Sequence, residues 1–265
     1  MKQKLLPDIL KELINGSTFT VGYNYVTANG SNTYTLSGIC DLHHIQPASK
    51  IIINSVEYKV KEYDKDLKTI TVTGTPQPPD VGVIILQRPY FIHGTPIAAN
   101  TEAGKTPLEI KTPLIYLMEP FDTYVNNDFN TSIYANCKFT LCFLTQAKTQ
   151  KWRTDDFYYN AIRPMANLAE DFINILKDSG LFFNDRLSYN IKYYTKFGIN
   201  IAGLGVKKLY FSENLSGVGV DLSVDIYKLD ECCVIKAPTV TDIELREDGT
   251  YELREDSDLE LREST

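Results

Sequence analysis

The sequence lacks the features that mark several common protein classes. No apolar run approaches about 18 residues, so no membrane-spanning helix is predicted. The first 15 residues have a basic beginning but no continuous apolar stretch, which is a poor match to a signal peptide. A Gly-x-Ser-x-Gly elbow and a Gly-Lys-Ser/Thr phosphate loop are both missing. We therefore predict no catalytic residues, cofactor or metal site from these motifs.

Metal-binding side chains are few. The chain has five cysteines, three histidines and no Cys-x-x-Cys pair. Cys137 and Cys142 lie in an apolar strand pattern, where small buried thiols are common, and the odd number of cysteines favours a reducing compartment. The candidates for a small metal-dependent enzyme are Asp41, His43, His44 and His93. Adjacent strand residues point to opposite faces, so the histidine pair cannot easily share one ion, and a polar barrel loop also explains it.

The net charge of −7 argues against a general nucleic-acid binder, which needs a basic surface. The charge is unevenly distributed, because residues 241–265 hold ten acidic residues and three arginines. The remaining 240 residues hold 24 basic and 24 acidic residues and are neutral overall. The chain is therefore a balanced body with an acidic C-terminal segment.

The first third of the sequence predicts a short helix followed by many short strands. Residues 5–14 place apolar side chains at helical spacing, and a helix this short must dock on another surface. Residues 18–87 contain short alternating segments separated by turn signals such as Asn29-Gly30. This pattern is typical of a small barrel or sandwich. Residues 76–79 predict a rigid extended connection before its last strand.

The second half carries the strongest periodicity. Alternation over 133–143 and 218–226 predicts two long strands, and further strands are expected at 113–118, 189–195 and 206–211. Apolar residues from Tyr158 to Leu176 follow at steps of four and three, which predicts one long helix that Thr154 caps. Pro164 removes an amide inside this helix, so we expect a kink there. Asp221 and Asp225, which share a strand face with Ser223, are interpreted as a solvated surface.

These patterns define an α+β protein with four parts. Residues 1–16 form a helix that docks on the main domain, and residues 17–95 form an inserted, barrel-like β-domain. Residues 96–235 form an antiparallel sheet with one long packed helix, and residues 236–265 form an acidic repeat tail. We expect segments 88–110 and 119–130 to be long loops that contact other proteins, together with residues 241–265.

The C-terminal segment contains a repeat of eight residues. Glu-Leu-Arg-Glu begins at Glu244, Glu252 and Glu260, and an apolar residue precedes each copy. A solvated acidic tail is the first interpretation. The second is three minimal strands with one apolar face, which would need a partner surface because so small a ribbon is unstable alone.

Tyrosine is abundant, with 17 residues. Tyr134, Tyr194 and Tyr227 fall on faces opposite the apolar stripe of their strands. Amphipathic aromatic side chains suit protein interfaces, but tyrosine also favours strands for their own sake. Both interpretations stay open from the sequence.

The order of elements in the second half resembles neck proteins of tailed bacteriophages, of the tail-terminator or tail-completion kind. The resemblance covers roughly residues 105–235 and rests on segments 113–118, 139–144, 161–166, 172–176, 215–222 and 230–232. No single motif is specific, and residues 18–87 depart from the family pattern. The added β-domain and the tail are similar to ring proteins in the neck of crAss-like phages.

The resemblance implies a non-enzymatic ring of identical subunits that joins the portal to the tail in the virion. Such a ring stacks on neighbouring neck, portal or tail rings and leaves a channel through which DNA passes without tight binding. Twelve subunits would match a portal and six a tail tube, and we favour twelve by analogy. The alternatives are a glycan-binding or host-attachment β-module of a phage tail and the metal-dependent enzyme named above.

Overall fold

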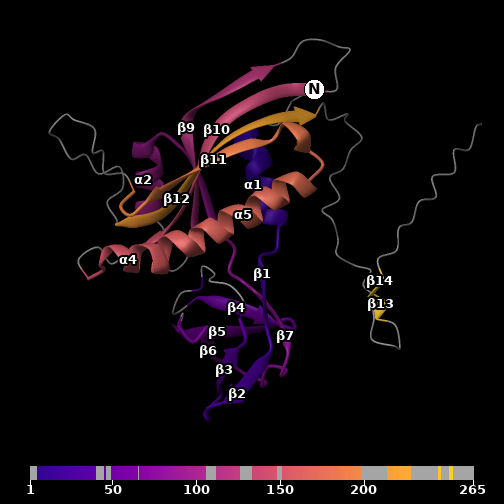
Figure 1. Ribbon diagram of the computed structural model, residues 1–265, viewed down its shortest axis with the longest axis vertical. Helices are drawn as coiled ribbons and strands as arrows, with labels where there is room; N and C mark the ends of the chain where they lie inside the picture. The colour runs from indigo at the N-terminus through magenta and orange to yellow at the C-terminus, as the bar shows by residue number, and fades with distance from the viewer. Residues whose placement is uncertain are drawn as a thin grey trace, which may run out of the picture.

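A computed structural model gives the fold of the chain (Figure 1). It describes residues 5–39, 45, 49–64, 66–105, 112–125, 133–147, 151–197, 214–227, 244–245 and 251–252. Within these ranges the protein is a mixed α+β molecule with mostly antiparallel sheets, few helices and one long helix. None of the described helices is long and apolar enough to cross a membrane.

The strands of the first third close into a small barrel. They form one sheet in the order β1-β7-β4-β5-β6-β3-β2, with every pairing antiparallel. Their bounds are β1 Thr20–Tyr23, β2 Tyr25–Ala28, β3 Thr33–Ser37, β4 Lys50–Ile53, β5 Val56–Asp64, β6 Thr69–Thr73 and β7 Gly82–Ile85. Only Asn24 separates β1 from β2. One bent segment therefore pairs first with β7 and then with β3, which closes the sheet as the sequence pattern predicts.

Two tyrosines anchor the proline-rich segment to the barrel core. Tyr23 and Tyr58 are among the largest fully buried side chains. Their hydroxyls donate hydrogen bonds to the carbonyl oxygens of Pro79 and Pro76, at 3.0 and 2.8 Å. The two aromatic rings are therefore buried in the core, and each hydroxyl still has a hydrogen-bond acceptor.

The second sheet has the order β11-β12-β10-β9-β8. Its bounds are β8 Tyr90–Gly94, β9 Leu114–Val125, β10 Ile133–Gln146, β11 Ser188–Tyr194 and β12 Leu215–Tyr227. The alternation predicted for β10 and β12 is confirmed, and these two strands pair along their whole length. The expectation of a purely antiparallel sheet is wrong at one edge, because β8 pairs with β9 in parallel. Helix α2 (Pro96–Lys105) supplies the crossover that a parallel pair requires.

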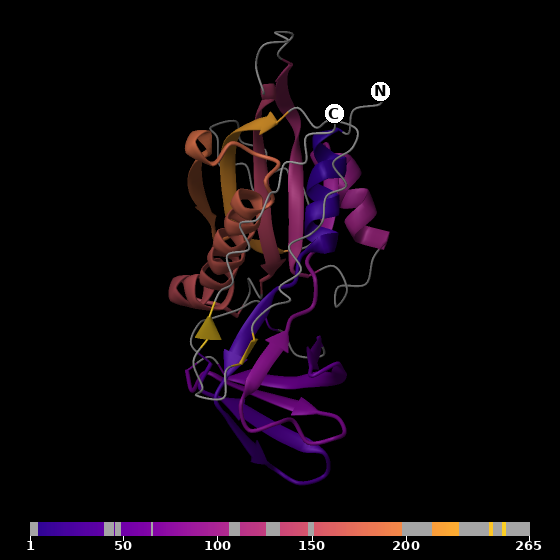
Figure 2. The ribbon, with the colours of Figure 1, turned by 90° about the vertical axis from the view of Figure 1, so that its right-hand side faces the viewer.

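Helices cover both faces of this sheet (Figure 2). Helices α1 (Leu6–Gly16) and α5 (Arg163–Asp178) contribute to one apolar cluster with β10 and β12, in which Leu10, Phe143 and Phe172 are fully buried. On the other face Ala99 of α2 packs in a second cluster that includes Tyr116. The first cluster continues into the barrel, so both parts of the molecule share one core.

The predicted long helix is confirmed and has an irregular turn. It begins as α4 (Thr154–Phe157), passes through a π-helical turn at Tyr158–Ile162 and continues as α5. The irregularity lies directly before Pro164, as expected of a residue that lacks an amide hydrogen. Thr154 is the first residue of the helix rather than its cap. Asp156 serves the cap instead, because its carboxylate accepts a hydrogen bond from the Arg153 amide at 2.8 Å.

The expectation of long loops at 88–110 and 119–130 is wrong for most of these residues. Segment 90–94 is β8, segment 96–105 is α2, and segment 119–125 is the second half of β9. The last of these looks irregular in sequence, but pairing with β10 supplies its backbone hydrogen bonds. The chain rejoins the larger sheet at Tyr90, ahead of the domain boundary expected at residue 95.

The C-terminal repeat contains two minimal strands, β13 (Glu244–Leu245) and β14 (Tyr251–Glu252), which pair antiparallel. This agrees with the strand interpretation for the first two copies of the repeat. The third copy, at Glu260, and the strand predicted at 206–211 lie outside the described residues.

Candidate functional site

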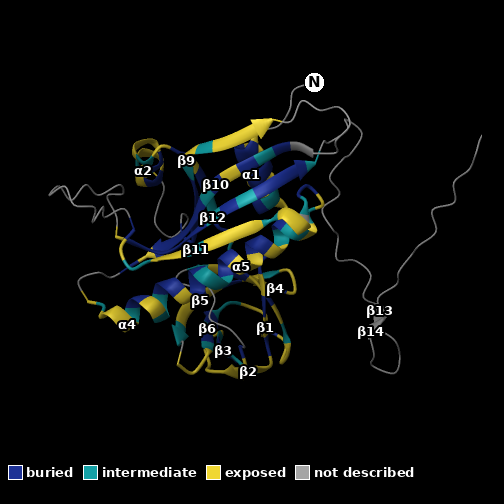
Figure 3. Cartoon of the chain, turned by 45° about the horizontal axis from the view of Figure 1, so that its top comes forward, coloured by how far each residue is buried: buried dark blue, intermediate teal, exposed yellow. Residues whose placement is uncertain are grey.

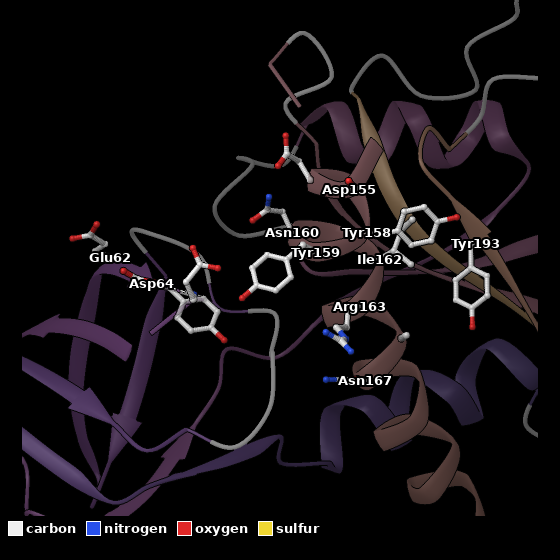
Figure 4. A pocket seen from close by; sticks show the side chains of 14 residues that line it. Glu62, Asp64, Asp155, Tyr158, Tyr159, Asn160, Ile162, Arg163, Asn167 and Tyr193 are labelled. Atoms are coloured by element: carbon white, nitrogen blue, oxygen red, sulfur yellow. Dashed lines mark hydrogen bonds between the residues drawn. The ribbon is translucent and has the colours of Figure 1, made fainter. Parts of the chain in front are cut away.

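A cleft of about 1160 Å³ lies between the barrel and the long helix. The barrel contributes the turn after β5, the helix contributes its π-helical turn and the start of α5, and β11 contributes Tyr193 (Figure 4). Figure 4 shows Asp64 and Tyr159 facing each other across the cleft, with Arg163 one turn further along the helix. The cleft therefore exists only because two parts of the chain fold against each other.

Carboxylates are frequent along this cleft. The set consists of Glu62, Asp64, Asp66, Asp155 and Asp156. Two of them already have structural roles: Asp156 serves the cap of α4, and the Asp64 carboxylate accepts hydrogen bonds from the amides of Asp66 and Leu67 at 3.0 and 2.9 Å. These two hydrogen bonds hold the turn that follows β5. Its position opposite the helix was not predicted.

Tyr159 connects the two sides of the cleft. Burial raises the pKa of its phenol, and the nearby Asp66 carboxylate, which accepts its hydrogen bond, raises that pKa further. The positive charge of Arg163 acts in the opposite direction. None of the described lining residues is a histidine, cysteine, serine or threonine. The described lining of the cleft is thus polar and aromatic, with carboxylates, tyrosines and the Arg163 guanidinium.

The candidate metal ligands are not brought together in the part of the structure that is described. His93 on β8 lies 3.6 Å from the Glu119 carboxylate and next to the ring of Phe91. Asp41, His43 and His44 lie outside the described residues. Within the described ranges no three His, Cys, Asp or Glu side chains are grouped as metal ligands.

The sequence pattern predicted that the two aspartates of β12 form a solvated surface. The structure shows instead that both take part in hydrogen bonds within the sheet domain. Asp225 is 7% exposed and accepts hydrogen bonds from Asn136 at 2.7 Å and Arg186 at 3.2 Å. Asp221 accepts one from Thr140 at 2.7 Å and pairs with Lys192. Asn136 and Thr140 stand on β10 and Lys192 on β11, whereas Arg186 lies in the short helical turn just before β11. Because all four are far from their aspartate in the sequence, only the tertiary structure could reveal the network. A second, shallower hollow of about 480 Å³ lies beside Asp221.

The surroundings of Asp221 and of the two described cysteines shift the pKa values of these three groups. Burial alone would raise the pKa of Asp221, but hydrogen bonds from Lys192 and Thr140 and the lysine charge lower it below 3.8. Cys137 and Cys142 are free and fully buried, as predicted, and burial raises the pKa of both thiols. Neither thiol is placed or ionised as a nucleophile would be.

The tyrosines divide into two groups. Tyr227 stacks on Phe183 with ring centroids 3.6 Å apart, and Tyr194 packs edge-to-face on Phe197, so these two belong to the fold. Tyr189 and Tyr193 on the edge strand β11 are 46% and 57% exposed, and Figure 3 shows this strand as an exposed edge beside the buried β12. The side chain of Tyr134 lies outside the described set.

Comparison of the chain with protein-family models, with curated proteins and with solved structures finds no match. The function must therefore be argued from the surfaces of the molecule.

Proposed function

We propose that this chain is a structural subunit of a homo-oligomeric ring in the neck or tail of a tailed bacteriophage. The tail-terminator-like domain would form the ring wall, and the barrel and the C-terminal segment would contact adjacent rings. Twelve subunits are favoured, as in a portal, and six would match a tail tube. The ring would join head to tail in the virion around the DNA channel, with no enzymatic activity.

The observation that carries this proposal is the pair of sheet edges. Among the described residues, β11 and β8 have a strand neighbour on one side only, and they lie at opposite ends of the sheet. A ring of identical subunits requires two different surfaces that meet head to tail and close. Unpaired strand edges are templates for contacts between chains, and exposed aromatics on β11 suit an interface.

The end of β9 supplies a further contact surface. Tyr124 and Val125 are 60% and 50% exposed although they lie in a paired strand. This part of β9 was expected to contact neighbours as a loop, and it offers the same residues on a more rigid element. The neutral body also suits a channel in which DNA slides, because tight DNA binding depends on many basic contacts.

The test is the mass of the purified protein in solution, followed by negative-stain images of the same sample. A discrete ring with a central hole is expected, and its symmetry assigns it to the portal or the tail side. A monomer that carries about one zinc or manganese ion per chain would favour a metal enzyme, and binding on a glycan array would favour an attachment module. Tight DNA binding at physiological salt would contradict the ring proposal.

A pair of variants connects the ring to β11. Tyr193→Glu places a charge on the exposed edge strand, and we expect it to shift the protein from rings to monomers without lowering its melting temperature. Tyr25→Glu is the matched control, because Tyr25 is 68% exposed on the barrel strand β2. If both variants still form rings, β11 is not a ring contact.

A further inference from the structure

The outer wall of the barrel carries an apolar strip that nothing in the described structure covers. It consists of Ile52 on β4, Val83 and Ile85 on β7, and Val81 just before β7, which are 38%, 52%, 37% and 64% exposed. Ile52 stands directly opposite Ile85 in the sheet register. The barrel does not need these side chains for its core, because Ile51, Ile53 and Ile84 point inward and are buried. We call these four residues the outer-wall strip.

Lysines flank the outer-wall strip. Lys50 lies two residues before Ile52 on β4, and Lys59 on β5 stands directly opposite Lys50. Lys61 follows on the same outward face of β5, and Glu57 forms an ion pair with Lys50 at 2.8 Å. Two like charges in directly opposite positions destabilise a sheet. Glu57, which stands directly opposite Ile52, already pairs with Lys50, so Lys59 and Lys61 are the charges that favour an acidic partner next to the apolar strip.

The C-terminal segment has the complementary properties. In its described hairpin, Leu245 is paired with Tyr251 and Glu244 with Glu252. The register therefore pairs two apolar residues with each other and two glutamates with each other. The ribbon is far too small to be stable by itself. Residues 241–265 also carry the whole net charge of −7.

We propose that residues 241–265 dock on the outer-wall strip, with the apolar pair of the hairpin against Val83, Ile85 and Ile52. The acidic residues of the segment then lie along Lys50, Lys59 and Lys61. This contact buries an exposed apolar patch and an unstable apolar ribbon together, and it places acidic side chains beside Lys59 and Lys61. It depends on the barrel and the segment only, and not on the ring.

The connection is long enough for this contact. Sixteen residues lie between the end of β12 and the start of β13. Fully extended they span up to about 55 Å. The whole chain of 265 residues, when compact, has a radius of gyration of roughly 18 Å. The segment can therefore reach a distant face of the molecule, or the barrel of a neighbouring copy.

Photo-cross-linking of the full chain tests the proposal. p-Benzoylphenylalanine replaces Tyr251, which keeps an aromatic ring at that position, and cross-linked peptides are identified by mass spectrometry after irradiation. We expect cross-links to peptides that contain residues 50–54 or 81–86. Val83→Glu in the same background should lower their yield about tenfold, which corresponds to about 1.4 kcal/mol of docking free energy. Lys59→Glu should also lower it, and added salt should do the same.

The control is Thr27→Glu, at an exposed position on β2 outside the strip, which should leave the yield unchanged. Cross-links to other surfaces, or a yield that Val83→Glu does not change, would overturn the docking. If Val83→Glu impairs folding, as judged by its melting temperature, Val83→Ser replaces it. Ring formation is scored separately: rings without a wall cross-link overturn the docking alone, and a wall cross-link within a monomer supports docking and contradicts the ring.

Discussion

At the scale of single residues, Gly217 occupies a position of β12 that has no room for a side chain. A Cβ atom built at this position would lie 2.0 Å from the carbonyl oxygen of Phe143 on the neighbouring strand. The close approach of two backbones is the physical reason for the residue at position 217.

Gly217→Ala should therefore destabilise the protein by about 1–3 kcal/mol, because the added methyl group forces β12 away from β10. The measurement is chemical denaturation followed by circular dichroism. Gly16→Ala is the control, since a Cβ there would meet nothing within 4 Å, and we expect it to change stability by less than about 0.5 kcal/mol. Equal stability of both variants would show that β12 can shift freely.

Asp221 predicts a pH dependence. Its pKa in the folded protein is lower than the ordinary value of 3.8, so its contribution to stability is complete above that value and is lost as the pH falls through the lowered pKa. Asp221→Asn should lower the free energy of unfolding at neutral pH, and its difference from wild type should shrink in strong acid. Urea denaturation of both proteins between neutral pH and strong acid measures this difference in the free energy of unfolding. A difference that is independent of pH would contradict the role of the charge.

At the scale of elements, the long helix is held mainly by its apolar face. Phe172 is fully buried, and its ring centroid lies 5.9 Å from that of Phe143 on β10. The charged residues of α5 lie on the other side, as the helical spacing predicted. Packing against the sheet, rather than helix propensity, therefore fixes this element.

Phe172→Ala should cost about 3–5 kcal/mol, because it removes the apolar contact and leaves a cavity under the helix. Glu170→Ala on the exposed side of the same helix is the matched control and should be close to neutral. Thermal unfolding of both variants gives the comparison. A small loss for Phe172→Ala would mean that the helix is held by other contacts.

At the scale of the whole molecule, the barrel and the sheet domain are joined by more than the chain. Two connections cross between them, and the Leu86 amide of one donates a hydrogen bond to the Phe19 carbonyl of the other at 2.8 Å. The apolar cluster runs from the barrel through α1 to the sheet. We therefore expect the two parts to unfold as one cooperative unit.

Calorimetry should accordingly show one unfolding transition, with a calorimetric enthalpy equal to the van't Hoff enthalpy. Measurement on the dissociated protein removes the contribution of oligomer contacts. Two separate transitions would show that the barrel folds independently, and would contradict the shared core.

The sequence alone determined the elements whose side-chain pattern is local. The alternation of β10 and β12, the helix from Thr154 to Asp178 and the short strands of the barrel were all predicted, because periodic burial of apolar residues leaves a direct record in the chain. A kink at Pro164 was predicted from the missing amide, which is a local property, and the helix has a π-helical turn at Tyr158–Ile162, next to that proline.

Only the tertiary structure decided the features that depend on partners far along the chain. The parallel pairing of β8, the strand character of 119–125, the burial of Asp225 and the cleft opposite Tyr159 each arise where distant segments meet. Strand pairing and hydrogen bonding between distant segments create these features, and neither is written into any one segment. The exposed outer-wall strip is of this kind too, because alternation marks both faces of a barrel strand and closure of the sheet selects which face is buried.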